Sequence, residues 1–257
     1  MPPIELPEYG VVGVRAANPG PFTLTGTNSW IVLGEGNWLV DPGPALAEHL
    51  NALTEELERH GGLAGIALTH DHADHAEAVP AMRERFPQAR LAAARGEVDI
   101  RLSDGARAGP LEAIATPGHA PDHHAFLVRG AALTGDAVLG TGSVFIFPDP
   151  GSLAGYLNGL ERLRERGPTV LAPGHGPLVE DPAAKLDEYI AHRLDRERRL
   201  LEALGQGKRT MAELLDQVWD DAPAALRPAA AVTLAAHLDK LEDEGRLPDG
   251  VERPEGS

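Results

Sequence analysis

The first seventy residues alternate between the hydrophobic pattern of strands and that of a helix. Residues 11–41 read as strands, and the glycine-containing turn at 34–37 between two apolar runs predicts a β-hairpin. Residues 44–60 carry leucines at helical spacing, and two consecutive glycines end that helix. A short apolar strand at 66–68 then runs directly into a polar segment rich in histidine. This alternation predicts an α/β fold.

The same order continues to about residue 176. We expect a helix at about 76–85, strands at 91–93 and 111–114, a hairpin of 125–128 and 131–134, a helix at about 152–166 and a strand at 169–171. His119, Asp136 and His175 each follow shortly after one of these strands. Loops at one edge of a sheet are where α/β folds collect their functional groups, so we expect these side chains to meet there.

After His175 the pattern becomes helical. The apolar side of a long helix at 183–204 would carry Leu186, Tyr189, Ile190, Leu194, Leu201 and Leu204. Further helices are expected at 210–219 and about 227–245, followed by a turn into a short β-element at 245–247 and a frayed tail from Pro248. The expected division is an α/β domain at 1–181 and a small helical, winged-helix-like module at 182–257.

The absence of cysteine narrows the possible chemistry. A 257-residue chain without cysteine has no disulfide, no thiolate metal site and no cysteine nucleophile, so a bound metal needs nitrogen and oxygen ligands. No apolar run approaches the ~20 residues of a membrane span, and the amino terminus lacks a signal-peptide pattern. We therefore expect a soluble, cytoplasmic protein with no membrane partner. The formal charge of −16 repels polyanions overall, although bound metal cations would reverse the field inside a cleft.

One segment carries most of the chemical information. His70, His72, Asp74 and His75 lie within six residues, directly after the apolar strand. Imidazole and carboxylate are the zinc ligands available to a protein without cysteine. In a loop that opens onto a helix, His70 and His72 can point to one metal, and Asp74 and His75 can reach a second. Isolated histidine pairs are often surface residues, but four ligand-type residues here and three more at strand ends argue against coincidence.

The segment Thr69–His75 resembles the His-x-His-x-Asp-His signature of the metallo-β-lactamase superfamily. Residues 116–119, 135–136 and 173–176 resemble its remaining motifs, in the same order. Residues 116–123 and 173–177, with the helical extension, are similar to the β-lactamase-like protein 2 group. That group includes a zinc-dependent endoribonuclease and has relatives that act as thioesterases. The resemblance covers about residues 20–180 and implies a four-layer αββα sandwich.

The resemblance also implies a ligand set for two zinc ions, with manganese or iron as alternatives. The first zinc would be bound by His70, His72 and His119, the second by Asp74, His75 and His175, and Asp136 would bridge both. A hydroxide shared by two metals about 3.5–4 Å apart would attack a carbonyl carbon or a phosphorus, and the metals would take up the oxyanion charge. Asp74 would orient this nucleophile as well as bind metal, so Asp74 and Asp136 are the expected catalytic carboxylates.

These features favour a binuclear zinc hydrolase that acts on an ester, a thioester or a lactone. The main alternative is a zinc-dependent endoribonuclease that cleaves single-stranded RNA. A β-lactamase is disfavoured because such enzymes of the superfamily commonly place cysteine at the bridging position, which Asp136 occupies here. A non-catalytic metal-binding protein is a further alternative, although a complete ligand set without catalysis would be unusual.

Five more residues are candidates with two interpretations each. Asp41, at a strand end, could accept a hydrogen bond from a ligand imidazole or cap a turn. Asp122 and His123 could orient a ligand or give a proton to the leaving group, or could cap a turn. Phe145 and Phe147, in a glycine-flanked apolar segment, could contact an acyl chain or a base, or could pack beneath their own loop.

The net negative charge of the carboxy-terminal module makes binding to double-stranded DNA unfavourable. From residue 206 onward there are six basic and eleven acidic residues, whereas a DNA-reading helix needs a basic face. The basic cluster of the connecting helix is interleaved with Asp195 and Glu197 and is typical of a solvated face; it comprises Arg193, Arg196, Arg198 and Arg199. We expect the module to serve packing, substrate entry or dimerisation, with a small molecule or single-stranded RNA as the substrate.

Overall fold

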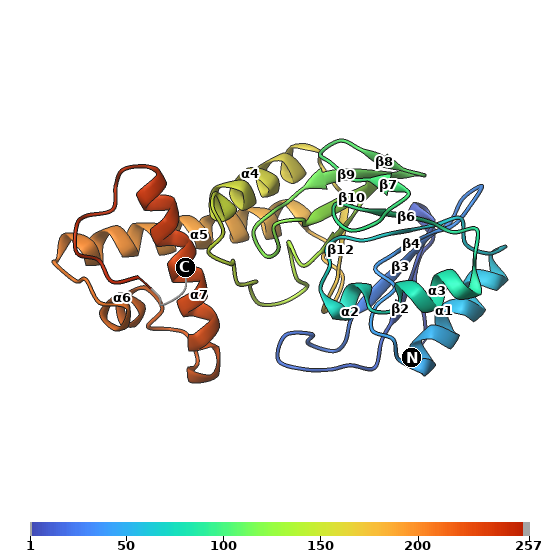
Figure 1. The fold of residues 1–257 in the computed structure, drawn as a ribbon, viewed down its shortest axis with the longest axis horizontal. Coiled ribbons are helices and arrows are strands. Elements are labelled where there is room, and N and C mark those ends of the chain that lie inside the picture. Colours follow the sequence, from blue (N-terminus) through green and yellow to red (C-terminus); the bar gives the residue numbers. More distant parts are fainter. Residues whose placement is uncertain (1, 254–257) are drawn as a thin grey trace.

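Two β-sheets pack face to face between two layers of helices in the computed structural model, which describes residues 2–253 (Figure 1). The first sheet has the order β1-β2-β3-β4-β5-β6-β7. Its strands are Ile4–Leu6 (β1), Val11–Arg15 (β2), Asn28–Val32 (β3), Trp38–Val40 (β4), Gly65–Ala67 (β5), Arg90–Ala93 (β6) and Ile100–Arg101 (β7). Neighbouring strands are antiparallel as far as β4 and parallel from β4 to β7.

The second sheet has the order β12-β11-β10-β9-β8. Its strands are Arg107–Ala108 (β8), Leu111–Ala115 (β9), His124–Val128 (β10), Ala131–Gly135 (β11) and Val170–Pro173 (β12). β8 to β11 form an antiparallel meander, and β12 joins β11 in parallel. Since β9, β11 and β12 therefore run in the same direction, their carboxyl ends meet at one edge of the sheet.

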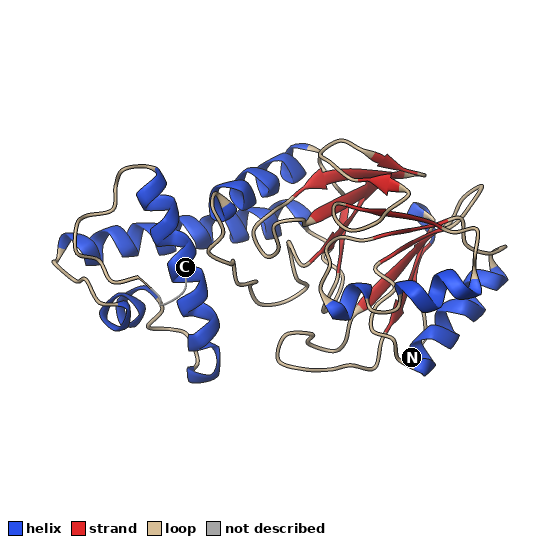
Figure 2. Ribbon diagram, in the orientation of Figure 1, coloured by secondary structure: helices blue, strands red, loops and turns tan. Residues whose placement is uncertain are grey.

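Three apolar clusters account for the four layers. Side chains such as Trp30 and Phe126 fill the space between the two sheets. The outer face of the first sheet packs against Ala47–Arg59 (α1) and Val79–Arg85 (α3), through residues such as Leu53. The outer face of the second sheet packs against Ser152–Glu165 (α4) and the first half of Pro182–Gly205 (α5) (Figure 2). The expected αββα sandwich is confirmed.

The helix expected at 76–85 is instead two short helices. Ala73–Ala76 (α2) begins inside the histidine-rich segment, and α3 starts three residues after it ends. Pro80 lies in the first turn of α3, where its missing N–H costs nothing. In a continuous helix its ring would collide with the carbonyl group of Ala76, so the proline separates the two.

The carboxy-terminal module consists of the second half of α5 with Met211–Val218 (α6) and Arg227–Asp243 (α7), preceded by the short 3-10 helix Ala224–Leu226. A separate apolar cluster holds these helices together, with Leu200, Leu214, Leu234 and Leu238 fully buried. α5 is thus shared between the sandwich and the module (Figure 1). None of the helices within residues 2–253 is sufficiently long and apolar to cross a membrane.

Two predictions about the end of the chain were wrong. No strand follows Gly245 as far as residue 253, so the described part of the module lacks a β-element there. Residues 248–253 are not frayed: the Glu252 N–H donates to the Arg209 carbonyl oxygen (2.8 Å), and the Glu252 carboxylate accepts from Met211 N–H (2.8 Å). The rest of the predicted frayed tail, residues 254–257, lies outside the described residues.

The predicted faces of α5 were also partly wrong. Leu194, assigned to the apolar side, is 51% exposed, whereas Arg193 and Arg196, assigned to a solvated face, are only 2% and 7% exposed. The Arg193 guanidinium lies over the Tyr156 ring, and that of Arg196 lies over Trp219. Long basic side chains can bury their stems and heads where aromatic rings and carbonyl groups receive them, and those partners come from distant parts of the sequence.

Candidate metal centre

Four loops at one edge of the sandwich carry the seven predicted ligands. The loop after β5 opens onto α2 and supplies His70, His72, Asp74 and His75. His119, Asp136 and His175 follow β9, β11 and β12, whose carboxyl ends coincide. The structure therefore brings all seven side chains together in one site.

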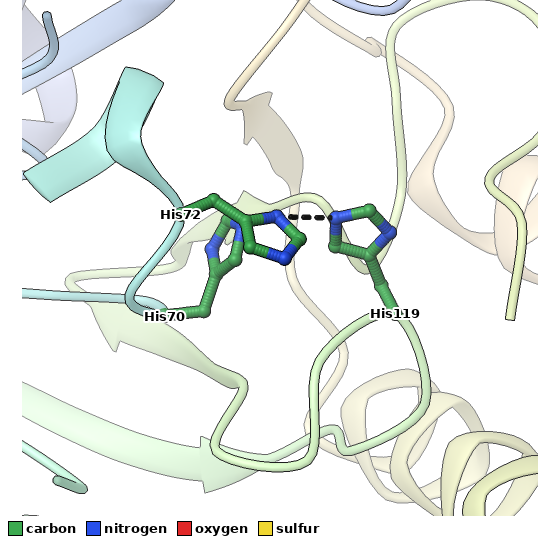
Figure 3. A group of neighbouring side chains, drawn as sticks. All are labelled: His70, His72 and His119. Atoms are coloured by element: carbon green, nitrogen blue, oxygen red, sulfur yellow. Dashed lines mark hydrogen bonds between the residues drawn. The ribbon is translucent and has the colours of Figure 1, made fainter. Parts of the chain in front are cut away.

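Three imidazoles form the first group, which combines His70, His72 and His119. Their nitrogens face one another: His70 Nε2 lies 2.9 Å from His72 Nδ1, which lies 3.0 Å from His119 Nε2 (Figure 3). Nitrogen ligands about 2.0–2.1 Å from a tetrahedral zinc ion are about 3.3 Å apart. The three rings are thus close to the spacing that a shared cation requires.

The second group combines Asp74, His75 and His175. His175 Nε2 lies 3.2 Å from both His75 Nε2 and Asp74 Oδ2, and the last two atoms are 3.6 Å apart. Gly174 allows this approach, because a Cβ atom at that position would lie 2.7 Å from the His75 ring and 2.8 Å from Asp136 Oδ1. Two imidazoles and one carboxylate are a ligand set that suits zinc, manganese or iron.

Asp136 lies between the two groups and presents one oxygen to each. Its Oδ2 is 3.4 Å from His119 Nε2, whereas its Oδ1 is 3.4 Å from the Nε2 atoms of both His75 and His175. Oδ1 is buried and has no hydrogen-bond partner among the described residues. An acceptor that is buried without a donor is costly, so this oxygen fits a position beside a cation. The donor set as a whole fits a pair of metal ions.

Hydrogen bonds on the far side of the rings orient four of the five imidazoles. His75 Nδ1 lies 2.9 Å from Asp41 Oδ2, and His70 Nδ1 lies 2.9 Å from Thr69 Oγ1, which itself donates to Asp41 (2.7 Å). His119 Nδ1 faces the carbonyl oxygen of Phe145 (3.3 Å), and His175 Nδ1 faces that of Gly26 (3.4 Å). Each acceptor favours the tautomer with a proton on Nδ1, which leaves the Nε2 lone pair free for a metal.

The other predicted residues differ in their positions. His123 accepts a hydrogen bond from the backbone N–H of Asp136 (3.0 Å), and its second nitrogen lies 2.8 Å from Thr116 Oγ1. His123 therefore holds the loop that carries the bridging carboxylate. Asp122 belongs to none of the described ligand groups, and one of its oxygens is buried without a hydrogen-bond partner among residues 2–253. Burial and the nearby Asp71 raise the pKa of Asp122.

Phe145 and Phe147 lie beside the metal-binding imidazoles. The Phe145 ring is 5.2 Å from that of His119, and Phe147 is 6.3 Å from His119 and 6.5 Å from His72. Phe147 is 36% exposed, and Phe145 is half-buried and packs edge-on against Phe22. Neither ring lies wholly beneath its own loop.

The electrostatics of the site favour ionised carboxylates facing imidazoles. Burial opposes the charge on Asp136, but His75 and His175 outweigh it and hold the pKa of this carboxyl well below its usual value. Burial would likewise lower the pKa of His75, yet Asp136 and Asp41 raise it well above the usual value. Burial and the neighbouring His75 and His123 hold the pKa of His70 well below its ordinary value. Metal binding requires ionised carboxylates and neutral imidazoles, so the cations would replace the protons that the carboxylates attract here.

A cavity of about 490 Å³ opens beside the two groups. His72, Asp74, His119, Asp136 and His175 line it at one end. Its other walls come from three segments: the loop at 21–24, the loop at 139–145, and residues 192–233. Sequence patterns predicted Phe145 as a possible substrate contact and substrate entry as a possible role of the carboxy-terminal module, but they did not identify the loop at 21–24. Sequence patterns also did not identify the carbonyl groups of Gly26 and Phe145 as hydrogen-bond partners of ligand histidines, because every residue has a backbone carbonyl group whatever its side chain.

The chain resembles known proteins over both of its parts. Residues 37–134 match the Beta-lactamase superfamily domain, and residues 210–249 match the Beta-lactamase associated winged helix domain. A Beta-lactamase-like protein 2 homolog of Caenorhabditis elegans is 32% identical over 262 residues, which cover 95% of this chain and 88% of that protein. An atrochrysone carboxyl ACP thioesterase of Aspergillus chevalieri is 32% identical over 242 residues, which cover 87% of this chain and 77% of that protein.

A solved structure agrees with this relationship. The crystal structure of a metallo-beta-lactamase family protein from Thermus thermophilus matches with a TM-score of 0.67 and 26% identity, over 93% of this chain and 95% of that chain. The ligand motifs, the sandwich and the matched carboxy-terminal domain thus agree with one another. The chain belongs to the metallo-β-lactamase superfamily of metal-dependent hydrolases, as a relative of the β-lactamase-like protein 2 homologues.

Proposed function

We propose that this hydrolase is binuclear and cleaves the acyl C–O or C–S bond of an ester, a thioester or a lactone after attack on its carbonyl carbon. The observation that carries the proposal is the position of Asp136, with one oxygen 3.4 Å from a nitrogen of the first group and the other 3.4 Å from two nitrogens of the second. When bound, two zinc ions supply a hydroxide nucleophile at neutral pH and an electrophile for the carbonyl oxygen.

The protein's own side chains would supply orientation and exclude water. The Asp74 side chain is 31% exposed and lines the cavity, so its carboxylate can accept a hydrogen bond from the attacking oxygen and direct it toward the carbonyl carbon. His123 keeps the Asp136 backbone fixed during this step. Phe22 and Phe145 meet edge to face in the lining of the cavity and would displace solvent from the reacting bond.

The lining of the cavity supports a carbonyl substrate more than RNA. Only two basic side chains other than histidine line it, and both are buried and donate hydrogen bonds within the protein. Arg196 donates to the two carboxylate oxygens of Asp221 (2.9 and 2.7 Å), and Arg193 donates to Ser143 Oγ (2.9 Å) and the Val144 carbonyl oxygen. Phosphodiester binding needs unpaired basic groups along the strand. The relative named as an ACP thioesterase points to the same class of carbonyl substrate.

Metal analysis and a substrate panel test the proposal. Freshly purified protein should contain close to two transition-metal ions per chain and should hydrolyse acyl thioesters or lactones in a manner that EDTA abolishes. His72→Ala combined with Asp136→Ala should abolish hydrolysis with an unchanged circular dichroism spectrum, whereas Asp71→Ala, at an exposed position in the same segment, should retain it. A metal-free protein, or EDTA-sensitive cleavage of RNA without thioester or lactone turnover, would overturn the proposal.

A further inference from the structure

The cavity beside the metal centre continues into the carboxy-terminal module. Besides the metal-binding residues, its lining includes Trp219, which follows α6, then Leu226 of the short 3-10 helix, and Ala229 and Ala230 of α7. A single space therefore joins the reacting centre to a wall that comes from the last fifth of the chain. One substrate molecule could therefore place its reacting bond at the metal centre and another part of its structure against this wall.

The module-facing end of this cavity is apolar, and its polar groups are already occupied. Arg196 lies over the Trp219 ring and is paired with Asp221, and the Thr233 hydroxyl accepts the Ile146 N–H (3.0 Å). Arg193 also lines the cavity, but it is only 2% exposed and donates to Ser143 Oγ and the Val144 carbonyl oxygen, and His192 accepts from Arg196 (3.1 Å). A ligand group at this end would thus meet mainly aromatic and aliphatic surface.

Exposed apolar side chains gather around the same cavity. Phe22 is 62% exposed and Leu226 is 44% exposed, and both line it. Phe147, which is 36% exposed, packs against Phe145 of the lining at a ring distance of 5.2 Å. Three of the five large hydrophobic residues that are exposed in the described chain therefore line this cavity or pack against its lining. Such clustering marks a surface that binds an apolar partner.

We propose that the module-facing end binds the hydrocarbon part of the acyl group, so that the preferred substrates are thioesters or esters of acyl chains with about eight or more carbons. This inference rests on the proposed function, because it assigns a substrate class to the same site. Each methylene that the cavity removes from water should strengthen productive binding about fourfold. The kcat/KM should therefore rise with chain length until the cavity is filled.

Narrowing the cavity from α7 tests the proposal. Ala229→Phe places a ring at a half-buried lining position, and Ala231→Phe places the same ring at a half-buried position of the same helix that does not line the cavity. With decanoyl and acetyl thioesters of one small neutral thiol, Ala229→Phe should raise the KM for the decanoyl ester at least tenfold and change acetyl turnover less than twofold. Ala231→Phe should leave both unchanged.

A second variant keeps the test decisive if Ala229→Phe folds poorly. Leu226→Ala removes an exposed side chain from the lining and should raise the decanoyl KM severalfold with the acetyl value unchanged. Equal effects on both esters, or none in either variant, would overturn the acyl site while the hydrolase proposal stands. Failure of the unmodified protein to cleave either ester or a lactone would instead overturn the proposed function.

A separate set of hydrogen bonds ties the loop at 139–147 to α5. The Tyr189 hydroxyl of α5 accepts from Leu139 N–H (3.1 Å) and donates to the Gly142 carbonyl oxygen (2.9 Å). One turn further along α5, Arg193 donates to the Val144 carbonyl oxygen. The backbone of this loop thus takes its conformation from the helix beneath it.

The same loop holds one of the predicted metal ligands. The Phe145 carbonyl oxygen faces His119 Nδ1 at 3.3 Å, and the next residue, Ile146, donates its N–H to Thr233 of α7 (3.0 Å). We infer that Thr233 is a positioning residue: by fixing the Phe145–Ile146 peptide, it sets the orientation of the His119 ring. The module would then determine metal affinity although it supplies no ligand.

Metal affinity, measured apart from activity, tests this positioning role. Thr233→Val keeps the shape of the side chain but removes the hydroxyl, whereas Thr233→Ser keeps the hydroxyl. In chelator competition, Thr233→Val should weaken one of the two zinc-binding steps about tenfold, as expected when a group that orients a metal ligand is lost. Thr233→Ser should bind zinc with the affinity of the unmodified protein. Unchanged zinc binding in Thr233→Val, or equal weakening in both variants, would overturn the inference.

Discussion

Asp41→Asn should weaken the second metal-binding group without altering any predicted ligand. Asp41 is 1% exposed and accepts three hydrogen bonds, from Thr69 N–H (2.8 Å), the Thr69 hydroxyl (2.7 Å) and His75 Nδ1 (2.9 Å). Asparagine has the same shape but only one acceptor oxygen. If that oxygen keeps the Thr69 N–H, the amide NH₂ faces His75 Nδ1, and the ring must move its proton to Nε2. His75 then has no lone pair to offer a metal.

The expected loss follows from the number of contacts that change. Removing a hydrogen-bond partner behind a ligand histidine typically costs 10–100-fold in metal affinity, or about 1.4–2.7 kcal/mol. Only His75 of the second group contacts Asp41 directly, whereas His70 of the first group reaches it through Thr69. One zinc-binding step should therefore weaken by this factor and the other by less, in a titration against a chelating indicator.

A matched control separates this effect from a general loss of negative charge. Asp71→Asn makes the same change at an exposed position between His70 and His72, and should leave both binding steps as in the unmodified protein. Zinc affinities equal to the unmodified protein in Asp41→Asn would refute the claim that Asp41 sets the His75 tautomer. Circular dichroism of the metal-free variant checks that the sandwich remains folded.

Two further predictions concern stability. Glu197 is buried on α5 and accepts hydrogen bonds from Lys240 (2.8 Å) and Arg246 (3.0 Å). Glu197→Gln should therefore lower the free energy of unfolding, measured by urea titration, by about 1–3 kcal/mol. An unchanged value would show that these two ion pairs contribute nothing to stability. Burial, with the nearby Arg193 and Lys240, holds the pKa of His237 well below 6.5. Below about pH 6.5 this histidine is therefore protonated in the unfolded chain but stays neutral in the folded protein, so the free energy of unfolding should fall as the pH is lowered. His237→Leu should remove up to about 1.4 kcal/mol per pH unit of that loss, and identical pH profiles would contradict this explanation.

Strong periodicity is what made the larger elements predictable. The helices α1, α4, α5 and α7 and both long hairpins were expected within a few residues of their observed bounds, because each buries a repeating apolar face. The short strands β1, β7 and β8 were missed, since strands of two or three residues carry no period and depend on a neighbouring strand for pairing. The break at Pro80 was readable from the sequence, because a proline inside a helical pattern ends or restarts the helix.

The ligand set was predictable for a different reason. Each ligand follows a strand or belongs to one compact motif, so its position depends on local geometry that the sequence specifies. The cavity walls depend on how distant segments pack, and Arg193 illustrates the difficulty: an arginine beside acidic neighbours reads as solvated, yet Tyr156 and the Val144 carbonyl oxygen receive it in the interior. Residue type alone does not indicate which helix face will meet an aromatic ring.

Because the chain has a large net negative charge, the dependence of kcat/KM on salt concentration should differ between acyl thioesters and RNA. A formal charge of −16 repels an anionic substrate at long range, and raising the ionic strength shortens the Debye length to about 10 Å at 0.1 M. The kcat/KM for an anionic acyl thioester should therefore rise between about 0.02 and 0.2 M salt, while that for a neutral thioester of the same acyl chain should change less than about twofold. A substrate held through its phosphates would behave oppositely, because each neutralised phosphate makes binding weaker as salt increases. RNA cleavage with a steep fall in kcat/KM over this range would show that basic groups outside the described cavity bind the strand, and the endoribonuclease alternative would then replace the carbonyl hydrolase.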